Sequence, residues 1–391
     1  MAVFTTVVFL LMLKFYYQNF LFQLPIRNLP LIIVAFLLVL LVGYGLTRIS
    51  TDDKKLNALI LITMIAIFMI IATYWITVVP NLQVSDYGNF WSRAFNYEVG
   101  NPLYQDDNDY FSKYAYQTGF FVYVVGVVKI FGYHIFVIQF LNVIYQALIL
   151  YVTYLTVNKV FHNIRMARLA VLLLMIDLDW FALNAQTSNQ YLGSLMFLLT
   201  FYLLMLDKTK YYLLAGVTLA LGCIVRPIGP VVVAGIIVFG LLIKLWKQHN
   251  YQSSLKILAT LAIYFLLFSL AGWGIKASGI NEYGLSNRDS EWKFVTGLNY
   301  DSNGAYSPDL NRFIDPSKSR NEMNNVEKAQ VKRERTFLNQ HHSWLRLFVN
   351  KTQLLWSSRT MATDSTNFNL NHSQKTFDLV NYSAYIGSII L

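Results

Sequence analysis

Two charged residues, Asp86 and Arg226, stand beside long apolar runs, where charges are rare. Asp86 follows the apolar run 56–79 within VSDYGNFWSRAFN, whose aromatic side chains can shield a carboxylate and shift its pKa. Arg226 lies in CIVRPIGP and is the only charged residue between positions 211 and 243. A guanidinium is a planar fork that suits phosphate. The pair therefore predicts a site for a phosphorylated ligand, against the plainer alternatives of a solvated loop for Asp86 and a snorkelling side chain for Arg226.

Polar and aromatic side chains in two further segments could bind a substrate. Tyr87 and Asn89 flank Asp86, and Asp109 lies in the acidic and aromatic stretch NPLYQDDNDYFSKYAYQTG. Asn189 and Gln190 lie in the amide-rich turn ALNAQTSNQYLG. Their amides could bind a sugar, although capping a helix is the commoner role for such residues.

The composition places these residues in a membrane protein. Of the 391 residues, 55% are hydrophobic and 13% are charged, which is too much apolar surface for one water-soluble core. A helical span needs about 20 apolar residues. Candidate spans cover residues 2–22, 29–46, 56–79, 135–157, 166–183, 191–206, 211–225, 230–245, 255–273 and a last one from 382. We therefore expect an all-α polytopic membrane protein with about ten transmembrane helices.

Basic clusters predict the orientation, because short loops rich in Lys and Arg stay in the cytoplasm. Four clusters stand out: Arg48, Lys54 and Lys55; Lys159, Arg165 and Arg168; Lys208 and Lys210; Lys244, Lys247 and Lys256. If all four are inside, the loop 80–134 and the long segment 276–375 lie outside, and Asp86 is extracellular or periplasmic. The apolar run 120–131 cannot then span, and we expect a juxtamembrane helix on the outer surface with Lys129 reaching water.

The chain divides accordingly into four parts. Residues 1–55 hold two extra N-terminal membrane helices, and residues 56–275 form a membrane core that includes the external loop 80–134. Residues 276–375 form an external region with surface helices. Residues 376–391 begin a further membrane helix, which is either truncated or docks at the interface.

Several other chemistries lack support in the residues. The net charge of +10 is typical of basic cytoplasmic loops and anionic lipid contacts, so nucleic acid is set aside as a partner. The single cysteine, Cys223, excludes disulfides and thiolate zinc clusters within the chain. GxGxxG, GxxxxGK[ST] and HExxH are all absent. No residues indicate a metal site or a cofactor.

Taken together, the motifs resemble the GT-C superfamily of membrane glycosyltransferases. The resemblance rests on SDYGNFW, NDYFSKYAYQTGF, RPIGP, WKFVTGLNYDSNGAYSPD and NKTQLLW, and it runs from about position 56 to position 356. The most similar branch holds the protein O-mannosyltransferases and lipid A aminoarabinose transferases, in particular the related enzymes of Gram-positive bacteria.

This resemblance implies a transferase at the outer face of the cell membrane. It implies a polyprenyl-phosphate sugar donor, inversion at the anomeric carbon, and a glycan, teichoic acid or protein as the acceptor. Asp86 matches the loop aspartate that deprotonates the acceptor, and Arg226 matches the residue that binds the donor phosphate. Lys113 and Arg93 are further candidates for that phosphate.

One departure leaves alternatives open. Related enzymes often carry a second acidic residue where this chain has Asn189 and Gln190, which weakens the case for a carboxylate pair and leaves a divalent metal undecided. A catalytically inactive scaffold is therefore one alternative. A lipid-linked sugar transporter or flippase is another, although the matching halves of many transporters are not found here. An O-antigen-type polymerase or ligase is the third.

Overall fold

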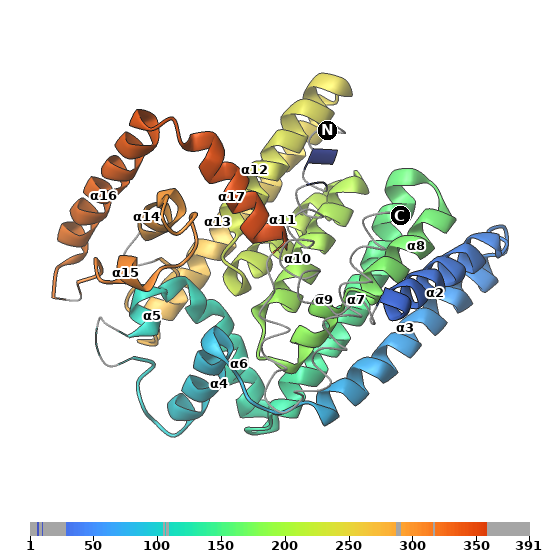
Figure 1. Cartoon of the computed structure of the whole chain (residues 1–391), viewed down its shortest axis with the longest axis horizontal. Coiled ribbons are helices and arrows are strands. Elements are labelled where there is room, and N and C mark those ends of the chain that lie inside the picture. Colours follow the sequence, from blue (N-terminus) through green and yellow to red (C-terminus); the bar gives the residue numbers. More distant parts are fainter. Residues whose placement is uncertain are drawn as a thin grey trace.

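The computed structural model describes residues 29–104, 106, 109–286, 291–315 and 317–357, together with 6, 7 and 10. All regular elements in these ranges are helices, which confirms the all-α prediction (Figure 1). The longer apolar helices are α2 (Leu29–Arg48), α3 (Lys54–Val78), α6 (Thr118–Phe131), α7 (Ile135–Phe161), α8 (Ile164–Met175), α10 (Asn189–Met205), α11 (Thr209–Val225), α12 (Gly229–Val238), the π-helical η5 (Phe239–Lys247) and α13 (Tyr251–Ala277). The remaining helices are α4 (Ser85–Glu98), α5 (Tyr110–Lys113), η3 (Ala115–Gln117), α9 (Leu178–Ala182), η4 (Leu183–Ala185), α14 (Trp292–Leu298), α15 (Pro308–Asn311), α16 (Arg320–Gln340) and α17 (Trp344–Ser357).

Four of the described helices are long and apolar enough to cross a membrane: Lys54–Val78, Ile135–Phe161, Gly229–Lys247 and Tyr251–Ala277. Shorter apolar helices lie at Phe36–Arg48, Ala115–Phe131, Asn189–Met205 and Thr209–Val225. Most of these elements coincide with the predicted spans. The first and last predicted spans fall outside the described residues, except for positions 6, 7 and 10. The division of the chain into four parts stays a prediction.

The single helix expected over 166–183 is wrong, because α8 ends at Met175 and a short α9 and η4 follow. The Asp177 carboxylate starts α9 by accepting a hydrogen bond from the backbone N–H of Trp180 at 3.1 Å. Amide side chains on α7 satisfy the carbonyls that the break exposes. Gln146 donates to the Trp180 carbonyl at 3.0 Å, and Asn142 donates to the carbonyls of Asn184 and Gln186 at 3.1 and 2.8 Å. Irregular backbone among apolar helices is stable only with such partners.

The apolar run 120–131 forms α6, as predicted, but this helix is not an isolated surface element. Phe120, Phe121 and Val124 are buried in a core shared with α4, α7 and α11. Lys129, near the end of α6, does reach solvent, and its ammonium lies 3.7 Å from the carboxylate of Glu98. The helix therefore anchors the loop that carries Asp86 to the membrane core.

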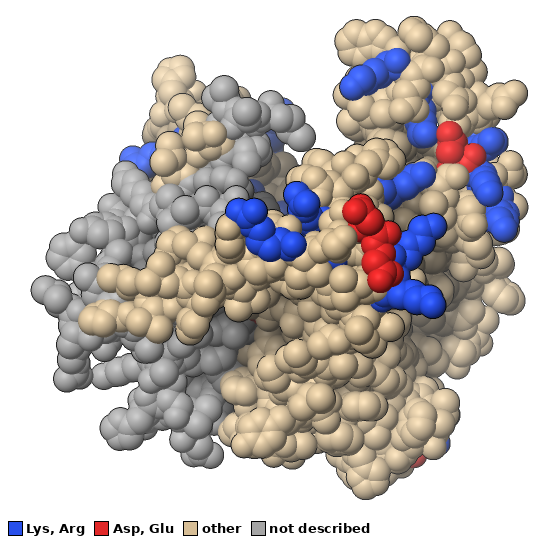
Figure 2. Space-filling model, turned by 90° about the vertical axis from the view of Figure 1, so that its right-hand side faces the viewer, with Lys and Arg blue, Asp and Glu red and all other residues tan. Residues whose placement is uncertain are grey.

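Exposed basic side chains gather where consecutive core helices are joined. In Figure 2, Lys and Arg side chains extend across the upper part of the face that lies on the right in Figure 1. The exposed basic residues of these junctions are Arg48, Lys54, Lys55, Lys159, Arg165, Lys208, Lys210 and Lys247. Two residues of the predicted basic clusters, Arg168 and Lys244, are buried instead.

Arg168, on α8, joins the end of α2 and the loop after it to α3. Its guanidinium donates to the carbonyls of Leu46 and Ile49 at 3.0 Å and of Ser50 at 2.9 Å, and also to the side-chain oxygen of Asn57. These oxygens compensate a buried cation without a carboxylate.

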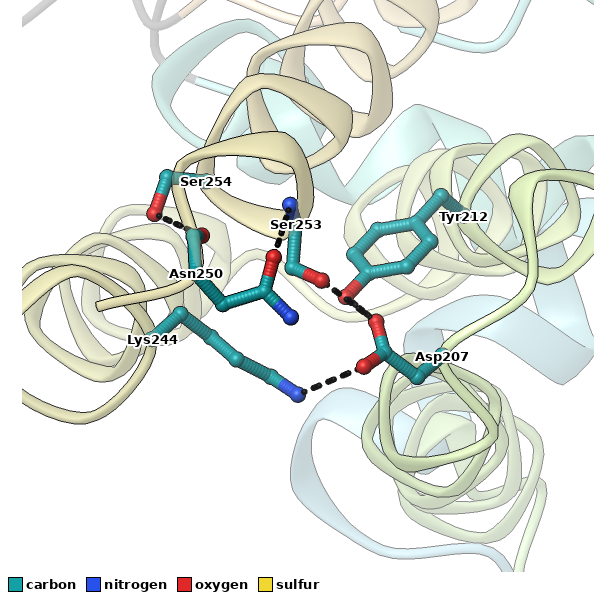
Figure 3. A network of polar contacts seen from close by, with 6 residues as sticks. All are labelled: Asp207, Tyr212, Lys244, Asn250, Ser253 and Ser254. Atoms are coloured by element: carbon teal, nitrogen blue, oxygen red, sulfur yellow. Dashed lines mark hydrogen bonds and ion pairs between the residues drawn. The ribbon is translucent and has the colours of Figure 1, made fainter. Parts of the chain in front are cut away.

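Lys244 belongs to a second polar network, shown in Figure 3. Its ammonium lies 3.3 Å from one carboxylate oxygen of Asp207. The other oxygen of Asp207 accepts from the hydroxyls of Tyr212 at 2.8 Å and Ser253 at 2.6 Å. One carboxylate thus holds α11, η5 and α13 to the junction that follows α10.

We predict that Asp207→Ala lowers the free energy of unfolding by about 2 kcal/mol, because it leaves the Lys244 ammonium, only 8% exposed, without its acidic partner. Thermal and denaturant unfolding in detergent measure the change. Adding Lys244→Met should restore part of the loss, since it removes the unpaired charge. Asp309→Ala, at a carboxylate that is 82% exposed, is the control. Equal stability of Asp207→Ala and the control would contradict the assignment.

Candidate active site

Hydrogen bonds between two loops hold the start of α4 against the start of α10. The Gln83 side chain donates to the Ala185 carbonyl at 3.0 Å and accepts from the N–H of Thr187 at 2.5 Å. The Gln186 side chain donates to the Leu82 carbonyl at 3.0 Å and accepts from the N–H of Val84 at 3.1 Å. This reciprocal pairing fixes the loop immediately before Asp86.

Asp86 lies in the first turn of α4. The chain enters this helix through Ser85 at a φ of 52°, in the left-handed region that residues other than glycine seldom adopt. Just beyond Asp86, a Cβ at Gly88 would lie 2.9 Å from the Gln83 carbonyl oxygen. Only glycine therefore allows the first turn of α4 to pack this closely against the preceding loop. The backbone is therefore strained and closely packed beside the carboxylate.

Arg226 caps the C-terminal end of α11, and its guanidinium donates to the side-chain oxygen of Asn189 at 2.8 Å. Asn189 is buried, and its amide group donates to Gln117 at 3.2 Å and to the Val225 carbonyl at 3.3 Å. A Cβ at Gly193 would come within 2.6 Å of the Arg226 Cβ. Glycine at this position of α10 therefore allows the arginine to approach.

Asp86, Arg226 and several tyrosines influence one another electrostatically. Burial raises the pKa of Asp86, while the Tyr110 hydroxyl and the positive charge of Arg226 oppose the rise. Solvent reaches the Asp86 carboxylate, but protein atoms crowd it enough for desolvation to dominate its pKa. Burial lowers the pKa of Arg226, while Tyr87 and Asp86 oppose that change. No carboxylate of the described residues lies within ion-pair distance of Arg226, so its charge is only partly compensated.

The Tyr110 hydroxyl is buried and has no hydrogen bond of good geometry within the described residues. It nevertheless lies near enough to Asp86 to stabilise the carboxylate form. The Tyr87 hydroxyl, on the other side of Asp86 in sequence, accepts from the Gln190 side chain at 3.1 Å. Because no described residue accepts a hydrogen bond of good geometry from Tyr110, its hydroxyl can donate to Asp86 or to a hydroxyl group bound beside it.

A cavity of about 290 Å³ adjoins the turn that carries Arg226. Its lining residues are Tyr116, Cys223, Pro227, Gly229, Pro230, Tyr264, Phe268, Leu285 and Lys293. Most of this wall is apolar, and the one cation among the lining residues is Lys293, whose ammonium lies 4.2 Å from the centre of the Tyr116 ring. Burial and the nearby charge of Arg226 lower the pKa of Lys293. The cavity thus has one cation in its wall, Lys293, and Arg226 lies at the turn that adjoins it.

The remaining candidates from the sequence are Arg93, Asp109, Asn89 and Lys113, and the first two pair with each other. The Arg93 guanidinium lies 2.5 Å from the Asp109 carboxylate. Asp109 also caps α5 by accepting from the N–H of Phe111 at 3.2 Å, which positions the neighbouring Tyr110. Asn89 on α4 and Lys113 at the end of α5 are half-buried. The ligand-binding roles of these four residues stay predictions.

Tyr110, Tyr116 and Lys293 were not singled out from the sequence. Tyr110 and Tyr116 belong to the aromatic stretch that precedes α6, but their spacing does not indicate which side chains face Asp86. Lys293 is more than 60 positions beyond Arg226, and only the folded chain brings the two near each other. In the described part of the chain, no three His, Cys, Asp or Glu side chains cluster closely enough to hold a metal ion.

We predict that Tyr110→Phe raises the pKa of Asp86, because the hydroxyl that stabilises the carboxylate is lost. Infrared difference spectra between each protein and its Asp86→Asn variant isolate the carboxylate band of Asp86, whose pH dependence gives the pKa. Tyr104→Phe is the matched control, since the Tyr104 hydroxyl donates to Glu282 at 3.0 Å. An unchanged or lowered pKa in Tyr110→Phe would refute the contact.

Comparison with known proteins bears on the core of this arrangement. Residues 120–273 match the model of a family described as dolichyl-phosphate-mannose-protein mannosyltransferase. The match covers less than half of the chain and includes Asn189 and Arg226, whereas Asp86 and Lys293 lie outside it. No curated protein matches the chain. The family match supports a place in the GT-C superfamily and indicates a membrane glycosyltransferase that uses a polyprenyl-phosphate-linked sugar.

Proposed function

We propose that the protein transfers a sugar from a polyprenyl phosphate to an acceptor hydroxyl at the outer face of the cell membrane, with inversion at the anomeric carbon. The observation that carries this proposal is the electrostatic coupling of Asp86 with Arg226 beside an apolar cavity. The carboxylate suits an acceptor hydroxyl, and the guanidinium suits the donor phosphate. The apolar wall suits the isoprenoid chain of the donor.

In the proposed reaction, Asp86 acts as the general base. Its carboxylate takes the proton of the acceptor hydroxyl as the oxygen forms a bond to the anomeric carbon. The bond between that carbon and the phosphate oxygen breaks, and the electron pair leaves with the polyprenyl phosphate. A positioned base of this kind accelerates a reaction by about 10²–10⁴-fold.

Arg226 would stabilise the leaving phosphate, which needs a cation more than a proton. Asn189 holds the guanidinium on one side, and the arginine has no carboxylate within ion-pair distance among the described residues. Donors that are fixed before the reaction stabilise developing negative charge most effectively. Lys293 would supply a second positive charge, and the cavity beside it would accept the first isoprenoid units of the donor.

The outer-face assignment rests on the two ends of α3 and α11. α3 has 25 residues, so its basic start at Lys54 lies about 37 Å from its end, after which Asp86 follows. α11 likewise begins beside Lys208 and Lys210 and ends at Arg226. The basic loops are therefore separated from the site by membrane helices, and the tendency of such loops to stay inside favours an outward-facing site.

We predict that Asp86→Asn lowers transfer by at least about 100-fold, because the acceptor loses its base. The assay uses purified protein in liposomes, a radiolabelled polyprenyl-phosphate sugar and membrane acceptors. Asp309→Asn, at a carboxylate that is 82% exposed, is the control. Full transfer by Asp86→Asn would reject the site. Loss of transfer from every variant, the wild type included, together with lipid scrambling, would favour the flippase alternative.

The pH dependence gives a second result from the same assay. Asp86 must be ionised, so activity falls as the pH is lowered through its raised pKa. Arg226→Gln removes a charge that holds this pKa down, and we expect its residual activity to fall at a higher pH than in the wild type. If activity of Arg226→Gln falls at the same acidic pH as activity of the wild type, Asp86 and Arg226 do not share a site.

For Lys293→Met we expect the KM for the lipid donor to rise about tenfold, which corresponds to one charge-assisted contact of about 1.4 kcal/mol. The value of kcat should change less, because Arg226 remains. Lys129→Met, at an ammonium whose side chain is 60% exposed, is the matched control. A change in kcat alone would contradict a binding role for Lys293.

A further inference from the structure

A second cavity lies at the opposite end of the helix bundle from Asp86. It has a volume of about 530 Å³, within the range of small-molecule sites in proteins. Its lining residues come from α2, α7 and α8: Leu40, Gly43, Tyr44, Thr47, Val157, Phe161, Met166, Leu169, Ala170, Leu172 and Leu173. The wall is almost entirely apolar, with Tyr44 and Thr47 supplying its hydroxyls. Nothing in the proposed transfer reaction uses this cavity.

Two exposed cations, Arg48 and Arg165, lie at one end of this cavity. The Arg48 guanidinium lies 4.6 Å from the centre of the Tyr44 ring, which lines the wall. Arg165 lies one turn before the lining residue Leu169 on α8, and therefore on the same face of that helix. The nearest acidic residues in sequence are Asp52 and Asp53, and Asp53 is engaged in capping α3 by accepting from the N–H of Lys55 at 2.7 Å. The rim therefore carries excess positive charge.

The cavity lies on the side of the molecule that α2 and α8 form, on the right in Figure 1 and facing the viewer in Figure 2. On this face Lys and Arg side chains lie above a broad surface without charged side chains. A basic rim over an apolar slot complements a molecule with an anionic head and a hydrocarbon tail. A soluble anion would leave the apolar cavity unfilled, and a neutral lipid would leave the positive charge of its rim uncompensated.

We propose that this cavity binds an anionic phospholipid, with an acyl chain between α2, α7 and α8 and the phosphate between Arg48 and Arg165. Each basic residue near an anionic lipid contributes about fivefold to binding, the equivalent of about 1 kcal/mol. The bound lipid would join α2, which precedes the resemblance to the glycosyltransferase core, to α7 and α8. The site is independent of Asp86 and Arg226.

Gly43 offers a direct test, because it is a buried part of the cavity wall. A Cβ at this position would meet the Leu169 side chain at 3.4 Å and that of Leu172 at 3.8 Å, so a leucine would project into the cavity. Gly45, on the same helix, has open space around its Cβ position and is the matched control. Gly43→Leu and Gly45→Leu share the same gain in helix propensity and differ in whether they fill the slot.

The experiment is native mass spectrometry of protein from nanodiscs that contain equal amounts of phosphatidylglycerol and phosphatidylcholine. We expect the wild type and Gly45→Leu to retain phosphatidylglycerol preferentially and Gly43→Leu to lose it. The double variant Arg48→Gln, Arg165→Gln should bind phosphatidylglycerol about 25-fold more weakly.

Circular dichroism and thermal unfolding confirm that each variant is folded. Retention of phosphatidylglycerol by Gly43→Leu at the wild-type level would overturn the proposal, as would equal retention of both lipids by the wild type.

Discussion

The arrangement of the candidate site depends on one interaction, the hydrogen bond from Arg226 to Asn189. It joins the end of α11 to the start of α10, and Asn189 extends the contact to Gln117, just before α6. Gly193 makes the approach possible, because any side chain there would displace the Arg226 Cβ. The packing of α10 against α11 therefore decides the orientation of the guanidinium, and Asn189 links both helices to the segment before α6.

An amide at position 189 has a consequence that a carboxylate would not have. A carboxylate in contact with Arg226 would neutralise it and compete with an incoming phosphate. Asn189 accepts a hydrogen bond from the guanidinium and leaves its charge in place. The residue that departs from the pattern of related enzymes is thus consistent with an active enzyme, and it weighs against reading the missing second acid as a sign of an inactive scaffold.

Hydrophobic runs were sufficient to predict most of the fold. α3, α7, α10, α11 and α13 coincide with predicted spans, because a membrane helix is defined by length and apolar composition. The break after Met175 was not predictable in this way, since the run continues beyond it. The break depends on Asn142 and Gln146, which lie on α7 and satisfy its carbonyls from a distance in sequence. A hydropathy pattern does not record such long-range partners.

The sequence indicated the isolated charges of the site and the amide of Asn189, which contacts Arg226, but not the rest of the site. Asp86 and Arg226 were identified because each lies beside an apolar segment, where a charged side chain is energetically costly and is therefore often functional. Lys293 and Tyr110 lie in polar segments, where charges and tyrosines are common and carry no such signal. Arg93 and Asp109 illustrate the opposite case: both were candidate ligand-binding residues, and the structure pairs them with each other.

Comparison of the buried cations shows why the Arg226 region differs from the rest of the molecule. Arg168 is surrounded by backbone and amide oxygens, and Lys244 is paired with Asp207, so each is compensated within the fold. Arg226 has one amide partner, Asn189, and no carboxylate within ion-pair distance among the described residues. Its charge also lowers the pKa of a second cation, Lys293. Two like charges beside an apolar cavity repel each other in the absence of a ligand, and an anion with an apolar tail would relieve that repulsion. The repulsion between Arg226 and Lys293 lowers the stability of the fold locally, which is common at functional sites.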